Sequence, residues 1–502
     1  MTERPEPRRD LDWDARRARA FTDRTVDLYE ELLERLRDLP VTNRVTAGEV
    51  REALAIEIPD EPMPEDELFT YLRDMVFQRS MYPGHPRFMA YVSGAGTVPG
   101  AAGDLLAAGL NMNAGGWLLS PSASEIERHL TATFSHWFGM PAEAGGILVS
   151  GGAIANFVAL KVARDRHAGW DVRGEGLAGH PQLAIYLSTE THVVSARGAD
   201  MLGIGTDSVR SIPVDERYRI RIDALREAIG RDRETGVRPV AVVASAGTVA
   251  TGAIDPLEAL ADLCEEEGLW FHVDAAYGGP GAFTEDLAPL FAGIERADSI
   301  AFDPHKWLYT PLSGGCILVR DLQFLSDSFA VTATYVHQDT ERTGRGIDGG
   351  QLGPQFSRGN QSLKVWVSLL AHGRRAYTQR ISHDAALARY LGARAEERPD
   401  FELVTPVGLS ICCFRYVPPD LPAGPDREPY LSLLNERVMT ESQIDGRTFF
   451  SNAVLDGRFA LRACIVNFRT EADDLDATLD IAAEIGARLD AELRPSALGG
   501  AA

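Results

Sequence analysis

WFHVDAAYGG (270–279) and ADSIAFDPHKW (297–307) are the two stretches that decide the fold of this chain. Each contains a short, mostly apolar run that is closed by polar side chains. Such runs are typical of buried parallel strands, whose carboxyl ends meet at one edge of a sheet and carry the ligand site. The polar residues that close the two runs are Asp274, Asp303, His305 and Lys306.

Asp274 and Lys306 are the residue types that an aldehyde cofactor needs. A lysine amine can form a Schiff base with the aldehyde, and a carboxylate can keep a pyridine nitrogen protonated so that the ring accepts electrons. We expect burial and the cofactor to lower the pKa of Lys306. Taken alone, the pair is equally compatible with a strand-end carboxylate and a surface lysine.

The motif HVDAAYGG followed by DPHKW resembles the group II pyridoxal-phosphate-dependent amino acid decarboxylases, which include the aromatic-L-amino-acid and glutamate decarboxylases. Matching segments run from about His85 to the end of the chain. The resemblance implies that pyridoxal 5'-phosphate (PLP) is the cofactor, that Lys306 carries it covalently and that Asp274 pairs with its ring nitrogen. It also implies the type I PLP-dependent transferase fold, an α/β fold with a mainly parallel seven-stranded sheet.

Three parts are predicted along the chain: an N-terminal helical arm (1–84), a large PLP-binding domain (85–375) and a small C-terminal α+β domain (376–502). The arm helices are too small to form a core alone. In the resembling family such an arm wraps the partner subunit, which implies a homodimer with active sites at the subunit interface. Gly315 to Arg320 is predicted to form an edge strand, and a long helix from Ser362 is predicted to break near Gly373.

Composition narrows the class of protein. The chain has 502 residues, 45% of them hydrophobic, and a net charge of −23, which argues against nucleic acid and anionic membranes as partners. Its five cysteines show no CxxC spacing, so we expect reduced thiols in a cytoplasmic protein rather than disulfides or a metal site. No signal peptide and no membrane span are expected.

A phosphate site is predicted where the strand at 147–150 meets Gly151, Gly152 and the helix AIANFVALKVAR. The glycines let the backbone approach an anion, and the N–H groups and dipole of the helix start attract it. GGAIAN resembles the SGGAISN form of the glutamate-type members. We assign Gly152 and Ala153 to the phosphate, and any contact from Ala153 must come from its backbone.

Other cofactor contacts follow from the resemblance. STETHVVSA implies that His192 stacks on the cofactor ring and helps to orient the substrate carboxylate. Thr248 is a weaker candidate, because Val249 stands where the family often has a second threonine. Ala276, Asp303 and His305 are assigned to the cofactor with the motifs that contain them.

The resemblance also supplies substrate candidates: Tyr91, Val92, Asn113 and Trp117. Ordinary core packing is an equally good interpretation of Tyr91 and Trp117. Tyr335 lies in a polar, glycine-rich loop, where decarboxylases of the family carry a tyrosine whose phenol can return a proton to Cα. Related aldehyde synthases tend to have phenylalanine there, so Tyr335 favours simple decarboxylation. A loop aromatic that only closes the pocket is the alternative.

The sequence therefore predicts PLP-dependent decarboxylation of an L-amino acid, with an aromatic or hydrophobic substrate of the tryptophan, tyrosine, phenylalanine or DOPA type. A branched aliphatic or acidic substrate, of the valine or glutamate type, is the alternative. An aldehyde synthase or aminotransferase would use the same fold. A sulfur-removing lyase would need a reactive cysteine in the 321–361 stretch, which has none. A non-enzymatic role conflicts with the intact set of Asp274, His192, Lys306 and Tyr335.

Overall fold

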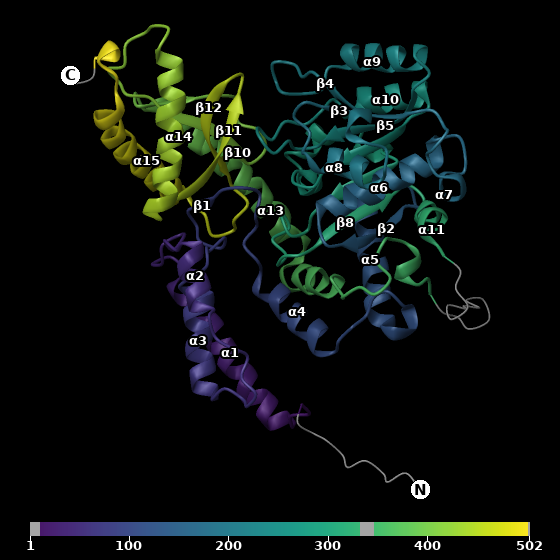
Figure 1. Cartoon of the computed structure of the whole chain (residues 1–502), viewed down its shortest axis with the longest axis horizontal. Coiled ribbons are helices and arrows are strands. Elements are labelled where there is room, and N and C mark those ends of the chain that lie inside the picture. The colour runs from purple at the N-terminus through teal and green to yellow at the C-terminus, as the bar shows by residue number, and fades with distance from the viewer. Residues whose placement is uncertain (1–10, 332–345, 500–502) are drawn as a thin grey trace.

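The computed structural model describes residues 11–331 and 346–499, which form two β-sheets with their helices (Figure 1). The seven-stranded sheet has the order β2-β8-β7-β6-β5-β3-β4 and the five-stranded sheet the order β1-β11-β12-β10-β9. The large domain is the first sheet with the helices packed on it, and the small domain is the second. The large-sheet strands are β2 (Gly145–Val149), β3 (Leu183–Ser188), β4 (Val209–Ile212), β5 (Arg238–Ser245), β6 (Trp270–Asp274), β7 (Ser299–Phe302) and β8 (Gly315–Val319). The small-sheet strands are β1 (Phe88–Met89), β9 (Phe401–Leu403), β10 (Ile411–Tyr416), β11 (Phe449–Leu455) and β12 (Arg458–Cys464).

The large sheet is mainly parallel, which confirms the prediction. Strands β7, β6, β5, β3 and β4 pair in parallel in that order, whereas β8 runs antiparallel to both of its neighbours, β2 and β7. The prediction of an edge strand at 315–320 is therefore wrong. The run GCILV is buried along its whole length, as is typical of an interior strand that is covered on both faces.

Helices cover both faces of the large sheet, which is why its strands are continuous apolar runs. One face is covered by α5 (Pro121–Trp137), α9 (Ile222–Glu234), α10 (Leu257–Glu267) and the first part of α13 (Ser362–Glu397). The other is covered by α6 (Gly152–His167), α8 (Val194–Met201) and α11 (Gln323–Phe329), with α7 (Val172–Glu175) beside α6. The 3-10 helices are η1 (Trp117–Leu119), η2 (Thr206–Ser208), η3 (Gly279–Phe283), η4 (Ala288–Phe291), η5 (Ile294–Arg296), η6 (Gly349–Gln351) and η7 (Ser496–Leu498).

The small domain packs α14 (Arg427–Asp445), α15 (Ala472–Leu493) and the second part of α13 on one face of its sheet. The other face contributes Ala453, Leu455 and Ala460 to the core shared with the large domain. Helix α13 links the two domains and is broken at Gly373, whose φ of +75° suits glycine, so the predicted break is confirmed. Strand β1 pairs with β11, so the segment predicted to open the large domain is joined to the small sheet. The boundaries at 84 and 375 stay predictions.

The N-terminal arm contains α1 (Ala15–Arg35), α2 (Ala47–Ala53) and α3 (Glu65–Phe77), and α4 (Val98–Gly109) follows it. In Figure 1 α1 and α3 lie side by side and extend away from the body of the molecule below the small domain. Helix α1 has no buried residue, and large apolar side chains are exposed on the arm and on α4. Within residues 11–331 and 346–499, no helix is both long and apolar enough to cross a membrane.

Candidate active site at the carboxyl ends of the large sheet

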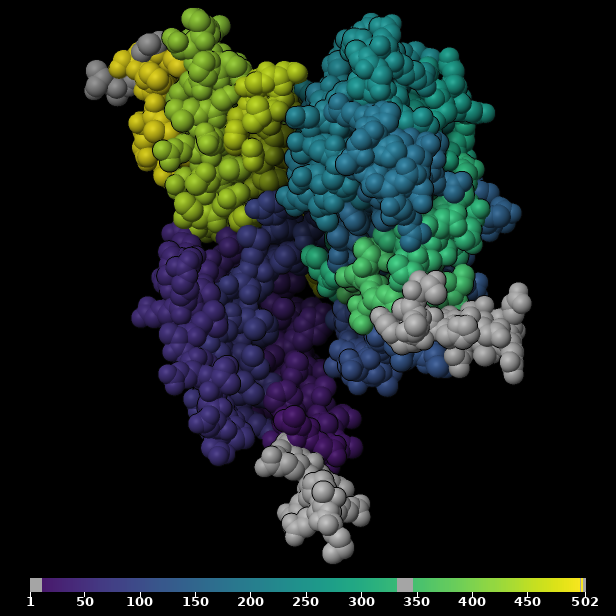
Figure 2. Space-filling model, turned by 45° about the vertical axis from the view of Figure 1, so that its right-hand side comes forward, coloured from purple at the N-terminus to yellow at the C-terminus, as the bar shows by residue number. Residues whose placement is uncertain are grey.

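A cavity of about 490 Å³ lies where the carboxyl ends of the parallel strands face the small domain. Its volume is in the range of small-molecule and cofactor sites. In Figure 2 the small domain, coloured green to yellow, and the teal part of the large domain are separate masses that meet along a seam. The cavity brings together most of the predicted site residues, namely Tyr91, Val92, Gly152, Ala153, His192, Thr248, Asp274, Ala276, Asp303 and Lys306.

Lys306 lies in the turn after β7, and its amine is held by a buried carboxylate. The Nζ atom is 2.9 Å from Oδ2 of Asp303, and the Lys306 N–H donates to the Asp303 carbonyl at 2.9 Å. Burial acts to lower the pKa of Lys306, but the charge and hydrogen bond of Asp303, helped by Asp274, leave it above its ordinary value. In the protein without cofactor, the two carboxylates outweigh burial, so the low pKa expected from burial and the cofactor together is not reached by burial alone. The amine must give up its proton before it can attack an aldehyde.

Asp274 is the last residue of β6 and is buried at the floor of the cavity. Its Oδ1 accepts a hydrogen bond from the Ala276 N–H at 3.1 Å. Burial raises the pKa of Asp274, and the Lys306 ammonium opposes that rise. A buried carboxylate of this kind favours a protonated nitrogen as its partner.

The glycine turn before α6 is supported by a chain of polar side chains. A Cβ atom at Gly152 would lie 2.8 Å from Oδ2 of Asp303, so only glycine fits above that carboxylate. The Asn156 amide donates to the Gly152 carbonyl at 2.8 Å and accepts from Nε2 of His272 at 3.0 Å. Nδ1 of His272 lies 2.8 Å from Oγ of Ser299. This chain holds the start of α6, whose first N–H groups have no partner within the helix and can bind an anion.

His192 and Thr248 line the cavity from loops that follow strands. Nδ1 of His192 accepts a hydrogen bond from the Val194 N–H at 3.3 Å, so in the neutral ring Nε2 carries the proton. Burial lowers the pKa of His192, which favours that neutral form. Thr248 places Oγ1 3.0 Å from Oγ1 of Thr251, and this contact holds the loop.

Other predicted site residues lie elsewhere. His305 is behind the glycine turn, with Nδ1 2.6 Å from the Gly314 carbonyl, and does not line the cavity. Asn113 accepts from the Gly115 N–H at 2.9 Å, and Trp117 donates to Glu125 at 2.9 Å. Both are outside the cavity, so their substrate role stays a prediction. Tyr335 lies outside the described residues.

The small domain supplies a wall that the sequence interpretation missed. Arg462 on β12 is 3% exposed, and its Nη1 donates to the Tyr91 carbonyl at 3.0 Å and to Ser451 Oγ at 2.9 Å. Its Nε and Nη2 have no hydrogen-bond partner among the described residues. The Asp456 and Gly457 turn between two apolar runs is a hairpin signal that could have located this wall. The lining residues that were not predicted include Asn156, Ser245, Tyr277, Ser451, Asn452 and Arg462.

The groups in the cavity fit PLP. Lys306 offers an amine for the aldehyde, Asp274 a carboxylate for the pyridine nitrogen, and His192 a flat ring for its face. The glycine turn and the start of α6 offer N–H groups for the phosphate. Arg462 also lines the cavity and places a positive charge there for an anionic group of a substrate.

Comparisons with known proteins identify the family of the chain. The model of the pyridoxal-dependent decarboxylase conserved domain matches residues 48–417. The aromatic-L-amino-acid decarboxylase of Bacillus atrophaeus is 34% identical over 451 residues, which cover 90% of this chain and 91% of that protein. Human cysteine sulfinic acid decarboxylase is 33% identical over 404 residues, 79% of this chain and 81% of that protein.

Solved structures give the same result. The crystal structure of Oryza sativa TDC with PLP and tryptamine superposes with a TM-score of 0.89 at 26% identity, and the match covers 95% of this chain and 99% of that one. The type I fold and the PLP cofactor predicted from the sequence are thereby confirmed. The chain belongs to the pyridoxal-dependent decarboxylase family and is a PLP-dependent carboxy-lyase that acts on amino acids.

Proposed function

We propose that this enzyme converts an aromatic or hydrophobic L-amino acid, of the tryptophan, tyrosine, phenylalanine or DOPA type, to the corresponding amine and carbon dioxide. The observation that carries this proposal is that Tyr91, Val92 and Tyr277 line the cavity together with the positively charged Arg462. An apolar side chain would pack on the first three, and the α-carboxylate would bind Arg462. The similarity to an aromatic-L-amino-acid decarboxylase supports the same substrate class.

The residues that line the cavity from the large domain form its large-domain wall, and each of them has one role in this proposal. PLP, when bound, supplies an aldehyde and a ring that accepts the electron pair left by the departing carboxyl group. Lys306 holds the cofactor through its Nζ atom, Asp274 keeps a proton on the ring nitrogen, and His192 packs against the ring. Gly152 and Ala153 bind the phosphate through their backbone N–H groups, and Thr248 supports the adjacent loop. Asp303 orients Nζ of Lys306 and can receive its proton, with Oδ2 2.9 Å away.

Tyr335 is proposed as the acid that returns a proton to Cα after carbon dioxide leaves. Replacement of Tyr335 by phenylalanine is expected to shift the product from amine toward aldehyde, with dissolved oxygen as the oxidant, water consumed, and hydrogen peroxide and ammonia released with the carbon dioxide. Quantification of both products on one substrate tests the assignment. Unchanged amine output would remove Tyr335 from the mechanism.

An acidic amino acid is the second candidate substrate, and Arg462 favours it as well. If the α-carboxylate is bound elsewhere, the positive charge of Arg462 at the cavity suits a side-chain carboxylate or sulfinate. The similarity to human cysteine sulfinic acid decarboxylase supports this alternative.

Carbon dioxide release from each of the twenty amino acids, from DOPA and from cysteine sulfinate tests the proposal. We expect turnover of aromatic or large apolar substrates, with no hydrogen peroxide or keto acid. Preference for glutamate, aspartate or cysteine sulfinate would establish the acidic alternative. Keto acid without carbon dioxide would identify an aminotransferase.

A homodimer and a cytoplasmic location belong to the same proposal. Val26 on α1, Leu105 and Leu106 on α4 and Leu110 directly after α4 are exposed in the single chain, and a second copy would cover them. Light scattering of the purified protein at several concentrations tests the dimer. The five cysteines are buried free thiols, as expected in a reducing compartment.

A further inference from the structure

The segment that follows Lys306 is tied to helix α13 by one buried carboxylate. The Trp307 indole N–H donates to Oδ2 of Asp384 at 3.1 Å, and the Tyr309 hydroxyl donates to the same oxygen at 2.6 Å. All three side chains are almost fully buried. Asp384 is far from Trp307 and Tyr309 in sequence, so these two hydrogen bonds fix the turn after Lys306 to helix α13.

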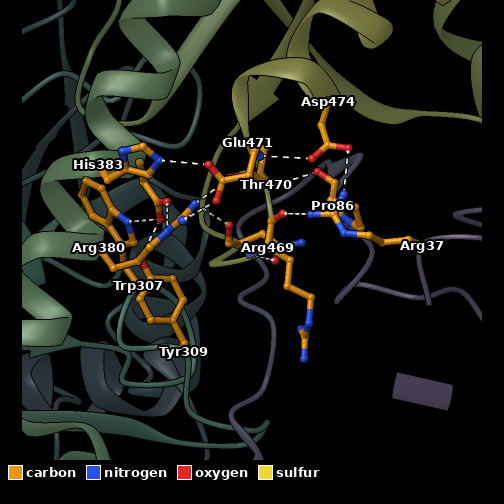
Figure 3. Close-up of polar contacts among 12 residues, drawn as sticks. Arg37, Pro86, Trp307, Tyr309, Arg380, His383, Arg469, Thr470, Glu471 and Asp474 are labelled. Carbon is orange, nitrogen blue, oxygen red and sulfur yellow. Dashed lines mark hydrogen bonds and ion pairs between the residues drawn. The ribbon is translucent and has the colours of Figure 1, made fainter. Parts of the chain in front are cut away.

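Arg380, one turn earlier on α13, extends this contact to the small domain (Figure 3). Its Nε donates to Oδ1 of Asp384 at 2.8 Å, and its Nη2 donates to the carbonyls of Thr470 and Asn467 at 2.8 and 3.1 Å. The Thr470 hydroxyl in turn donates to the Pro86 carbonyl at 2.7 Å. The carboxylate of Asp384 is therefore shared between the lysine turn and the loop that follows β12, the strand of Arg462.

The lysine turn has a conformation that needs such support. Tyr309 has a φ of +51°, a value that is unfavourable for a bulky side chain. Its N–H donates to the Lys306 carbonyl at 3.2 Å, so the backbone of Tyr309 closes the turn directly on the lysine. Trp307 stacks on Tyr277, which lines the cavity, with 5.2 Å between ring centroids. A shift of either aromatic ring would therefore move the position of Lys306.

We propose that Asp384 is a positioning residue for Lys306: its carboxylate holds Trp307 and Tyr309 so that the lysine amine points into the cavity, and Arg380 couples that position to the small-domain wall. The inference rests on the assignment of Lys306 as the cofactor lysine under the proposed function. Asp384 touches neither the cavity nor a reacting atom, so its effect passes through the two aromatic side chains.

The chain contains a matched control for a purely stabilising role. Asp490 on α15 is also buried, accepts from the Tyr430 hydroxyl at 2.5 Å and pairs with Arg494 four residues away, whose Nε is 2.9 Å from Oδ1. The same tyrosine, aspartate and arginine chemistry thus occurs in the small-domain core, where Asp490 accepts hydrogen bonds from Tyr430 and Arg494 and none from the residues that follow Lys306. A loss of stability alone should affect both sites alike.

The experiment compares Asp384→Asn and Tyr309→Phe with Asp490→Asn and Tyr430→Phe, all as full-length protein reconstituted with PLP. For the first pair we expect kcat to fall about ten- to a hundredfold, because small displacements of a reacting group have effects of this size. KM should change by less than about threefold. The pH midpoint of the visible absorption band of the bound cofactor should move by at least about half a unit. The control pair should lower the melting temperature without a change in kcat or in that midpoint.

Two results would overturn the inference: wild-type kcat and band midpoint in both Asp384→Asn and Tyr309→Phe, or equal losses in the control pair. Tyr309→Phe removes one hydroxyl only, so it decides the question if Asp384→Asn fails to fold. Borohydride reduction and peptide mapping of the wild type separate the premise from the inference. A label on Lys306 with no effect of either Asp384→Asn or Tyr309→Phe sinks the positioning role alone, whereas a label elsewhere sinks the proposed function.

Discussion

The two walls of the cavity are built in different ways. Asp274 and Lys306 follow neighbouring parallel strands, so the sheet itself brings them together. Arg462 and Ser451 lie opposite each other on the antiparallel pair β11 and β12, and Arg462 is further held by the carbonyl of Tyr91. The difference teaches that the wall for the cofactor depends on the ends of neighbouring strands, whereas the wall for the substrate combines a hairpin with a contact to the distant segment of Tyr91. Changes in the first wall should affect cofactor binding and kcat, and changes in the second should affect KM.

The strongest expected effect is that of Lys306→Ala, which removes the covalent attachment point. Carbon dioxide release should fall at least about 10³-fold, because no other amine lines the large-domain wall among the described residues. Borohydride reduction followed by peptide mapping should find no cofactor adduct. Lys364→Ala is the matched control, since that buried lysine pairs with Asp104 at 2.9 Å away from the cavity. An adduct in Lys306→Ala, or its absence in Lys364→Ala, would contradict the assignment.

The stability of the large domain should also depend on pH, because buried His272 supports the glycine turn through Asn156. Burial lowers the pKa of His272 to about 4. Because this folded-state value is below the ordinary one, the stability contributed by neutral His272 is complete above about pH 6.5 and is lost as the pH falls toward 4. A shift of two to three units in the pKa of His272 corresponds to roughly 3 kcal/mol of unfolding free energy. Urea unfolding of the apoprotein at pH 7 and pH 4.5 should show this loss.

The control for this pH effect is His272→Asn, which should be less stable at pH 7 but should lose less further stability on acidification. His85, whose pKa is also lowered to about 4 by burial, serves as a comparison outside the cavity wall. If His272→Asn and the wild type lose equal free energy between the two pH values, His272 is not the group that titrates.

Asp274→Asn should lower kcat about 10²-fold, the effect of losing a charge-assisted hydrogen bond of ~3 kcal/mol. The covalent link to Lys306 should persist, so the visible band should remain with a changed maximum. Steady-state kinetics and absorption spectra of the same sample give both results. An unchanged kcat would mean that Asp274 does not support the ring nitrogen.

The success of the sequence interpretation follows this same division between the walls. Asp274 and Lys306 could be predicted because short apolar runs mark buried strands and polar residues mark their ends. The hairpin that carries Arg462 has a local signal at Asp456 and Gly457, but the role of Arg462 has none, because it depends on the position of Tyr91, which no local pattern gives. The position of β8 inside the sheet was missed for the same reason, since strand order is a long-range property. The direction of the pKa shift of Lys306 could not be predicted either, because it depends on the position of the Asp303 side chain.

Arg462→Gln should raise KM about ten- to a hundredfold and leave cofactor content unchanged, since the variant loses the positive charge for the substrate and the hydrogen bonds to Tyr91 and Ser451, none of which involves the cofactor lysine. Arg462→Lys should recover little, because an ammonium group cannot reproduce the geometry of the guanidinium. Arg458→Gln, on the same strand and outside the cavity, is the control. An equal rise in KM for Arg458→Gln would indicate a general disturbance of β12 rather than a substrate contact.

The smallest expected effect tests whether the loop at Thr248 belongs to the cofactor wall at all. Val249 lines the cavity next to Thr248, at the position where resembling proteins often have a second threonine. Val249→Thr is nearly equal in size and adds a hydroxyl group, which should tighten PLP binding about two- to tenfold if it reaches the cofactor. Val194→Thr places the same change elsewhere in the cavity and should leave the dissociation constant of PLP unchanged. If Val249→Thr instead changes KM for the amino acid and not cofactor affinity, the loop belongs to the substrate wall and the boundary between the two walls must be redrawn.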